Sequence, residues 1–220
     1  AKPLVVGAEK HEKLLQDALP IARMILEPMG RNSAPAVAAA CLAYAAEDLV
    51  LILSADHDIQ DVAAFHRAIA IAAGAANDGA IVTFGVEPTH PATGYGYIKS
   101  IPDASEEALT VEDFVEKPDL KTAQAYIADG SYFRNAGIIM FKAETMLQAL
   151  SDFAPDVLTG TRRAMGNVDD QDCVRLDAKA FSETPSISID YAVMEKAGNV
   201  KTVPVSKGWS DVGGNRAMHK

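Results

Sequence analysis

Short apolar runs alternate with longer polar or alanine-rich stretches along the first ninety residues. The runs predict strands and the stretches between them predict helices, and this alternation indicates a parallel sheet with helices on both faces. One run, Leu49–Leu53, is continuously apolar, as expected for a central strand buried on both faces. The strands are expected at Leu4–Val6, Arg23–Leu26, Leu49–Leu53 and Ala80–Val86, and the helices at Glu9–Leu19, Pro35–Ala46 and Ala63–Ala76.

The pattern changes after Pro91, where shorter strands with glycine corners follow one another. They predict a mixed sheet inserted into the Rossmann-like core as a small second lobe. The expected fold class is therefore α/β, with a mixed, mainly parallel sheet flanked by helices and a small inserted β lobe. The segment Gly160–Ala178 has the weakest pattern. The other elements are expected at Tyr95–Ser100, Thr110–Val115 and Asn135–Phe141 for strands and at Leu120–Ala128 for a helix.

Length and charge narrow the function classes. The 220 residues suffice for one large α/β domain, so residues 1–220 are expected to form a single catalytic domain. A formal charge of −10 argues against a nucleic-acid-binding protein, because phosphate backbones require clustered Lys and Arg. The chain has no apolar stretch long enough for a membrane span, no signal-peptide pattern, and only two isolated cysteines, Cys41 and Cys173. These features favour a cytoplasmic protein that binds neither membrane nor nucleic acid.

Two acidic residues are candidates for a magnesium site. Asp56 lies just beyond the carboxyl end of the run Leu49–Leu53, where open α/β sheets bind ligands, and Mg²⁺ prefers oxygen ligands such as carboxylates. Asp56 or the nearby Asp58 could instead cap the following helix. Taken by itself, the position of Asp211 between Trp209 and Gly213 favours an ordinary turn. A metal between two phosphates needs more than one carboxylate, however, and Asp211 is the best remote partner for Asp56.

Polar residues at two later strand ends are candidates for sugar-phosphate binding. Glu116 could accept hydrogen bonds from sugar hydroxyls, and Lys117 could pair with a phosphate as a compact charge. The alternative is a solvated strand end that Pro118 terminates. Tyr95 and Gly96, in a run of alternating glycine and tyrosine, could offer an aromatic face and a close approach to the backbone, or could form only a tight turn.

Two further segments could contact a nucleotide or a sugar. The polar groups of Glu27, Arg31 and Asn32 follow a strand and could recognise a nucleobase edge, although Asn32 could serve only as a helix N-cap. The Asn135 amide could bind sugar hydroxyls or close a turn. The sequence contains no Ser-His-Asp or Cys-His set and no Walker motif, which favours direct displacement over a covalent intermediate.

Taken in order, these segments resemble the bacterial mannose-1-phosphate guanylyltransferases, a family of sugar nucleotidyltransferases. The resemblance covers the chain almost end to end. Individual matches are short, but their ordered series is specific. The matching segments are Glu27–Pro35 (family pattern EPxGRNTAPA), Ser54–His57 (PADH), Thr83–Val86 (TFGI), Thr93–Ile98 (TGYGYI), Phe114–Pro118 (FVEKP), Asn135–Gly137 (within WNSGMF), Ser188–Glu195 (SIDYAVME) and Gly208–Gly213 (GWSDVG).

The resemblance implies a GT-A-like nucleotidyltransferase that joins mannose 1-phosphate to GTP, forming GDP-mannose and releasing pyrophosphate, with Mg²⁺ as cofactor. Asp56 and Asp211 would hold the metal, and Lys117 would contact the sugar phosphate. In-line attack on the α-phosphorus needs mainly positioning and charge neutralisation, which these residue types can supply. Family members often dimerise, so a homodimer is also expected. The implied substrate-binding residues are Glu27, Arg31 and Asn32 beside guanosine, and Tyr95, Gly96, Glu116 and Asn135 facing mannose.

The chain also departs from the family pattern. The glycine-rich loop GGxGTRLWPLSR, which contacts the triphosphate in the family, has no counterpart, and neither has a C-terminal isomerase domain. Arg134 stands where the family usually has Trp, and Gly214-Asn215 stands where it usually has Ser-Trp. A fragment lacking these parts is therefore expected.

Two other functions stay open. Asp56-His57-Asp58 fits the DxD metal motif of GT-A glycosyltransferases, although the segments ending at Pro118 and Gly213 argue against that class. The missing loop would fit a catalytically inactive subunit that binds a nucleotide-sugar, but such a subunit has little use for two metal-binding carboxylates.

Overall fold

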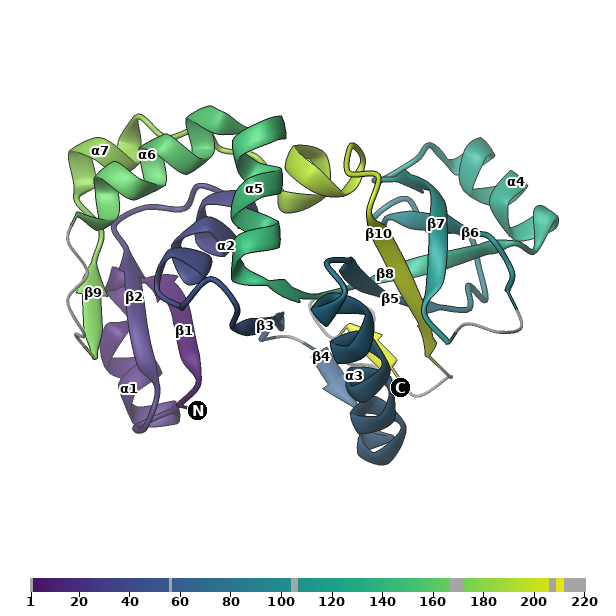
Figure 1. The fold of residues 1–220 in the computed structure, drawn as a ribbon, viewed down its shortest axis with the longest axis horizontal. Coiled ribbons are helices and arrows are strands. Elements are labelled where there is room, and N and C mark those ends of the chain that lie inside the picture. The colour runs from purple at the N-terminus through teal and green to yellow at the C-terminus, as the bar shows by residue number, and fades with distance from the viewer. Residues whose placement is uncertain (1, 56, 104–106, 167–171, 206–208, 212–220) are drawn as a thin grey trace. The chain divides into compact units, whose positions relative to one another are not determined.

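The computed structural model describes residues 2–55, 57–103, 107–166, 172–205 and 209–211, the last of these by its backbone alone. The chain divides into two compact units (Figure 1). The first comprises residues 1–48 and 146–196, and the second comprises residues 49–145 and 197–220. The expectation that residues 1–220 act as one catalytic domain stays a prediction.

The first unit is built on a three-stranded parallel sheet of β1 (Leu4–Ala8), β2 (Arg23–Glu27) and β9 (Cys173–Arg175), in the order β1-β2-β9. Because the strands are parallel, their carboxyl ends meet at one edge of the sheet, the edge that binds ligands in open α/β folds. The helical elements of this unit are η1 (Glu9–His11), α1 (Glu12–Ala18), α2 (Ser33–Leu42), α6 (Pro155–Met165), α7 (Ala178–Ser182) and the π-helical turn η2 (Asp190–Met194), and α5 (Ala143–Phe153) enters it from the second unit.

The second unit is built on a six-stranded sheet in the order β3-β8-β5-β10-β7-β6. A separate two-stranded antiparallel ribbon joins β4 (His57–Ile59) to β11 (Trp209–Asp211). The six strands are β3 (Leu49–Ile52), β5 (Ile81–Val86), β6 (Tyr97–Ser100), β7 (Leu109–Val115), β8 (Tyr132–Lys142) and β10 (Val200–Val205), and the helices are α3 (Val62–Asn77) and α4 (Leu120–Asp129).

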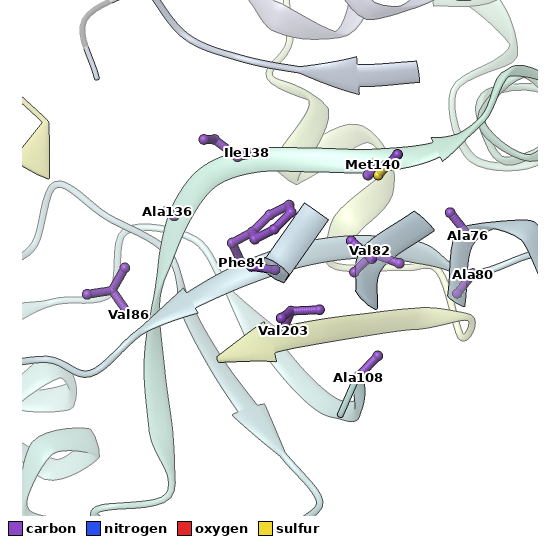
Figure 2. Close-up of a cluster of buried hydrophobic side chains, with 12 residues drawn as sticks. Ala76, Ala80, Val82, Phe84, Val86, Ala108, Ala136, Ile138, Met140 and Val203 are labelled. Carbon is purple, nitrogen blue, oxygen red and sulfur yellow. The ribbon is translucent and has the colours of Figure 1, made fainter. Parts of the chain in front are cut away.

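The core of the second unit lies between α3 and the middle of the six-stranded sheet. Every residue of β5 is buried, as predicted for the run Ala80–Val86. Figure 2 shows Val82 and Phe84 of β5 beside Val203 of β10 and Met140 of β8, with small alanines on the helix side. The alanines allow α3 to approach the strands closely, and burial of this apolar surface stabilises the unit.

The mixed α/β class is confirmed, and several details differ from the sequence prediction. The parallel pairing expected is present in the first unit and between β5 and β10, whereas the remaining pairs are antiparallel. The inserted β lobe expected after Pro91 is not a separate sheet, because β6 and β7 are hydrogen-bonded into the six-stranded sheet. The central position predicted for Leu49–Leu53 was wrong. β3 is an edge strand, Leu49 is 36% exposed and Leu53 is 51% exposed, and a short apolar run does not by itself distinguish an edge strand from a central one.

Candidate active site

Five of the predicted site residues come together in the second unit through backbone hydrogen bonds. The Asn135 amide on β8 donates to the Gly96 carbonyl just before β6, over 2.8 Å. The Lys117 amide, just after β7, donates to the Tyr95 carbonyl over 3.3 Å. β6 pairs with both β7 and β8, so the segments that carry Tyr95–Gly96, Glu116–Lys117 and Asn135 lie side by side.

Gly96 makes room for the Glu116 carboxylate. A methyl group on Gly96 would lie 2.7 Å from Glu116 Oε2, 3.2 Å from Phe114 Cζ and 3.3 Å from Asn135 Cβ. The Glu116 side chain is only 7% exposed, and its Oε1 forms an ion pair with Lys117 Nζ over 3.2 Å. A buried carboxylate with a defined partner is suited to accept hydrogen bonds in a fixed direction.

The Asn135 side chain is held in one orientation. Its Oδ1 accepts hydrogen bonds from Thr83 Oγ1 over 2.7 Å and from the Gly137 amide over 3.1 Å. Asn135 is buried, and Thr83 is completely so. Since the carbonyl oxygen of the amide is engaged, the geometry also fixes the direction in which the amide nitrogen can donate.

Arg134 stands at the position where the family pattern usually has Trp. Its guanidinium carbon lies 4.6 Å from the centre of the Tyr95 ring. This is the geometry of a cation–π contact, in which a planar guanidinium stacks on an aromatic face. Arg134 therefore supports Tyr95 beside the predicted sugar site, although it is not aromatic itself.

Among the described residues, the two non-glycine residues with positive φ are both predicted site residues. Asn32 has φ 67° and Lys117 has φ 49°. Such backbone conformations cost free energy for residues with a Cβ and are enriched at functional sites. At Lys117 the conformation accompanies the amide bond to Tyr95, directly after the strand.

Of the two predicted metal ligands, Asp211 belongs to β11 of the β4–β11 ribbon. Asp56 itself lies outside the described residues, as does the Asp211 side chain. The backbone of Asp211 pairs with His57, the residue that follows Asp56 in the chain. A methyl group on Gly137 would lie 3.7 Å from His57 Cε1, so the ribbon is next to the β8 segment that carries Asn135. The described side chains alone contain no cluster of three His, Cys, Asp or Glu that could hold a metal.

The three predicted base-binding residues belong to the first unit, and one of them, Glu27, lines a cavity at the carboxyl ends of β1 and β2. The cavity has a volume of about 620 Å³. One wall is Ala8–His11, and the other is Glu27–Gly30. Neither Arg31 nor Asn32 lines it. The sequence had indicated the second wall as a candidate binding segment, but the first was missed because Ala8–His11 carries no recognisable binding motif.

Glu27 is the distinctive group in this cavity. Its Oε1 is buried and has no hydrogen-bond partner among the described residues. Burial raises the pKa of the Glu27 carboxyl above its usual value of 4.5. A buried carboxyl oxygen without a partner is costly, and a ligand that donates a hydrogen bond to it would recover that cost.

Arg31 and Asn32 make contacts with the protein. Arg31 Nη2 donates to the Ser182 carbonyl and lies 3.6 Å from Met29 Sδ. The Asn32 side chain accepts a hydrogen bond from the Ser33 amide over 2.9 Å at the start of α2. The capping role that the sequence left open for Asn32 is therefore present, and it satisfies one of the unpaired amides at the helix start.

The comparison with protein families matches the family model described as "Nucleotidyl transferase" over residues 2–220. The chain belongs to the nucleotidyl transferase family. The sheet-edge sites of the two units are therefore parts of a nucleotidyl transferase fold. No helix within the described residues is long and apolar enough to cross a membrane.

Relatives of this nucleotidyl transferase chain include proteins named as mannose-1-phosphate guanylyltransferases. It is 47% identical to the xanthan biosynthesis protein XanB of Xanthomonas campestris pv. campestris (strain B100) and 42% identical to the mannose-1-phosphate guanylyltransferase of Escherichia coli (strain K12), each over 96% of this chain and 47% of that protein. A solved structure described as mannose-6-phosphate isomerase from Helicobacter pylori is similar with a TM-score of 0.87 and 32% identity, covering 96% of this chain and 84% of that one. The predicted resemblance to mannose-1-phosphate guanylyltransferases is confirmed. The chain spans about half the length of the curated relatives it matches.

Proposed function

We propose that the protein carrying this chain transfers a guanylyl group from GTP to mannose 1-phosphate, forming GDP-mannose and pyrophosphate. The family membership and the named relatives support this reaction class. The observation that carries the proposal is the assembly of Gly96, Glu116 and Asn135 by backbone bonds and close packing.

The site in the second unit is suited to a sugar phosphate. Glu116 can accept hydrogen bonds from sugar hydroxyls, and the Asn135 amide nitrogen is a donor whose direction is fixed because the carbonyl oxygen of that amide is engaged. Lys117, half exposed, supplies a positive charge for the phosphate without leaving the site. Tyr95, stacked on Arg134, offers a flat face to the sugar ring.

The cavity in the first unit is suited to guanine. The guanine N1–H and N2 amino group are adjacent donors, and a single carboxylate can accept from both. Glu27 presents such a carboxylate, with one buried oxygen lacking a partner. Adenine, uracil and cytosine do not offer this pair of adjacent donors, so binding them would leave the carboxylate unsatisfied. Arg31 and Asn32 would then support the loop that follows Glu27, and we assign them no direct base contact.

Asp56 and Asp211 would hold Mg²⁺ in this proposal. The donor set fits, since two carboxylates are hard oxygen ligands, and the β4–β11 register brings Asp211 opposite the residue after Asp56. When bound, Mg²⁺ neutralises phosphate charge and orients the phosphates of the nucleotide.

The chain's own residues position the acceptor for an in-line displacement. A phosphate oxygen of mannose 1-phosphate forms the new bond to the α-phosphorus of GTP, and the bond from that phosphorus to the bridging oxygen breaks as pyrophosphate leaves. Lys117 holds the attacking phosphate, while Glu116 and Asn135 hold the sugar that carries it. No side-chain nucleophile is required, and positioning with charge neutralisation supplies the rate enhancement.

Pyrophosphate release in the intact protein tests the proposal. We expect release with GTP and mannose 1-phosphate together and little release when ATP or UTP replaces GTP. A GT-A glycosyltransferase would instead consume a nucleotide-sugar without releasing pyrophosphate, and an inactive subunit would bind GDP-mannose without turnover; either result would refute the proposal. The cytoplasmic location and the homodimer stay predictions.

A further inference from the structure

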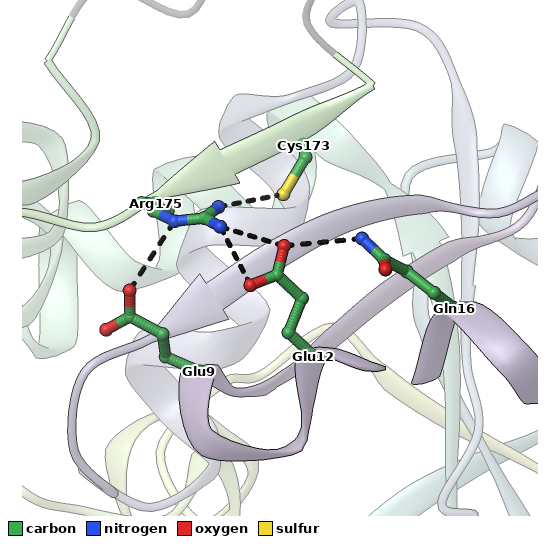
Figure 3. A network of polar contacts seen from close by, with 5 residues as sticks. All are labelled: Glu9, Glu12, Gln16, Cys173 and Arg175. Carbon is green, nitrogen blue, oxygen red and sulfur yellow. Dashed lines mark hydrogen bonds and ion pairs between the residues drawn. The ribbon is translucent and has the colours of Figure 1, made fainter. Parts of the chain in front are cut away.

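Arg175 joins three segments of the first unit beside the base cavity (Figure 3). Its Nη2 contacts both carboxylate oxygens of Glu12, over 2.8 and 2.7 Å, and its Nε lies 3.5 Å from Glu9 Oε1. Its Nη1 lies 3.4 Å from Cys173 Sγ, and Gln16 Nε2 donates to Glu12 over 3.3 Å. One guanidinium thus ties η1 and α1 to the end of β9.

The segment that Arg175 holds is a wall of the base cavity. Glu9 lines the cavity and also pairs with Arg175. On the neighbouring strand, Arg175 is paired with Leu26, the residue before Glu27. The guanidinium therefore connects the wall Ala8–His11 to the strand pair that carries the opposite wall. Its contacts can thus influence the distance between the two walls.

Ala8 is held by its pairing with Glu27 in the β1–β2 sheet, but beyond β1 few contacts among the described residues hold this wall in place. Neither η1 nor α1 contains a buried residue, and neither has a side-chain N-cap. Leu15 packs on β1, where a methyl group on Gly7 would lie 2.8 Å from Leu15 Cδ1. A segment with so little burial opens at low free-energy cost, so the ion pairs of Arg175 with Glu12 and Glu9 can decide its average position.

We propose that Arg175 is a positioning residue for the nucleobase: through Glu9 and Glu12 it holds Glu9–His11, the part of the wall beyond β1, at the spacing that lets a guanine reach Glu27. This rests on the proposed function, because it takes the cavity as the base site. Arg175 does not line the cavity, so it acts through the wall. Exposed ion pairs contribute little to stability, so its loss should change binding more than folding.

The test compares the kinetic constants of Arg175→Ala and wild-type intact protein, with GTP and mannose 1-phosphate each varied in turn. If the wall keeps its competent position only a fifth to a tenth of the time without Arg175, the KM for GTP should rise roughly five- to tenfold. The KM for mannose 1-phosphate and kcat should stay within about twofold of wild type, since the ion pairs lie outside the sugar site. Arg175→Lys should recover only part of the GTP affinity, because a single ammonium cannot reproduce the three nitrogens with which the guanidinium contacts Glu12, Glu9 and Cys173.

A matched control uses another exposed ion pair of the same sheet. Lys2 pairs with Asp172 over 3.3 Å at the amino ends of β1 and β9, away from the cavity. Lys2→Ala should leave the KM for GTP unchanged. Equal KM values for GTP in Arg175→Ala and wild type would overturn the proposal, and so would equal changes for both substrates, which would indicate a general structural defect.

The outcomes distinguish the positioning role of Arg175 from the proposed guanylyl-transfer activity. Wild-type protein that releases no pyrophosphate refutes the proposed function, and direct calorimetric titration with GTP then decides the role of Arg175 by the same fold-change. Wild-type protein that is active with GTP, together with an unaffected Arg175→Ala, refutes only the positioning role. Absence of any GTP binding by wild type refutes both.

Discussion

Gly96→Ala tests how closely the predicted sugar site is packed. Gly96 is buried and does not have a positive φ, so alanine fits the backbone conformation at this position. The added methyl group would lie 2.7 Å from Glu116 Oε2, whereas an ordinary contact begins at 3.4 Å. The added methyl group cannot shift away from the carboxylate, because Phe114 and Asn135 already lie close to it on other sides. The carboxylate must therefore move by about 0.7 Å.

The expected effect follows from that displacement. A misplacement of about 1 Å at a reacting centre can cost about 10²-fold in rate, so kcat/KM for mannose 1-phosphate should fall by roughly 10- to 100-fold. Strain from overpacking should also lower the free energy of unfolding by about 1–3 kcal/mol. The KM for GTP should change little, since the base cavity is in the other unit.

Steady-state kinetics with each substrate varied in turn, together with thermal unfolding, would measure both effects. Gly94→Ala is the matched control. It lies two residues away, is exposed, and has nothing within 4 Å of the added methyl group, so it should behave as wild type. If Gly96→Ala keeps wild-type kcat/KM for mannose 1-phosphate while folding normally, then Glu116 does not bind the sugar as argued.

Three further predictions concern charge. Asp211→Ala should lower turnover by at least about 10²-fold, as expected for losing one electrostatic stabiliser, and adding Asp56→Ala should cost much less than the product of the two single effects, since residues that act as a unit are non-additive; near-normal turnover of Asp211→Ala would remove it from the metal site. Lys117→Ala should raise the KM for mannose 1-phosphate more than that for GTP, and equal effects on both would contradict its assignment. Glu27→Gln should raise the melting temperature at pH 7, because burial raises the pKa of this carboxyl and its charged form opposes folding above the ordinary value of 4.5. That gain should vanish in scans below about pH 4, where the carboxyl is protonated in both states, and a gain independent of pH would point to packing.

Local patterns predicted the elements that carry most of the site. The run Ala80–Val86 became the fully buried β5, and the segments ending at Ser100 and Val115 became β6 and β7. Because β5 and β6 pair with β8, residues that the sequence could only suggest separately, such as Gly96 and Asn135, meet in the structure.

Pairing between distant segments was not predictable in the same way. The region Gly160–Ala178 had the weakest pattern, yet it forms the end of α6 and the short strand β9. β9 has only three residues, and its parallel pairing with β2 places Arg175 beside Glu9 and Glu12, more than 160 residues away. No local periodicity encodes such a contact. The contacts of Arg175 and the cavity wall Ala8–His11 could therefore be identified only from the structure.

Asn32 and Leu49–Leu53 show where one signal fits two structures. An Asn before an alanine-rich helix fits both an N-cap and a base contact, and the structure has the cap. A continuous apolar run fits both a central and an edge strand, and β3 is at the edge. Neighbours in space decide these cases, and the sequence of one segment does not contain them.

The fate of the α-phosphate of GTP decides whether the protein transfers a guanylyl group to mannose 1-phosphate. Intact protein incubated with Mg²⁺, mannose 1-phosphate and GTP labelled at the α-phosphorus should place the label in a nucleotide-sugar, and label at the γ-phosphorus should appear in pyrophosphate. Recovery of the α label only as GTP, GDP or GMP, with mannose 1-phosphate unchanged, would contradict the account.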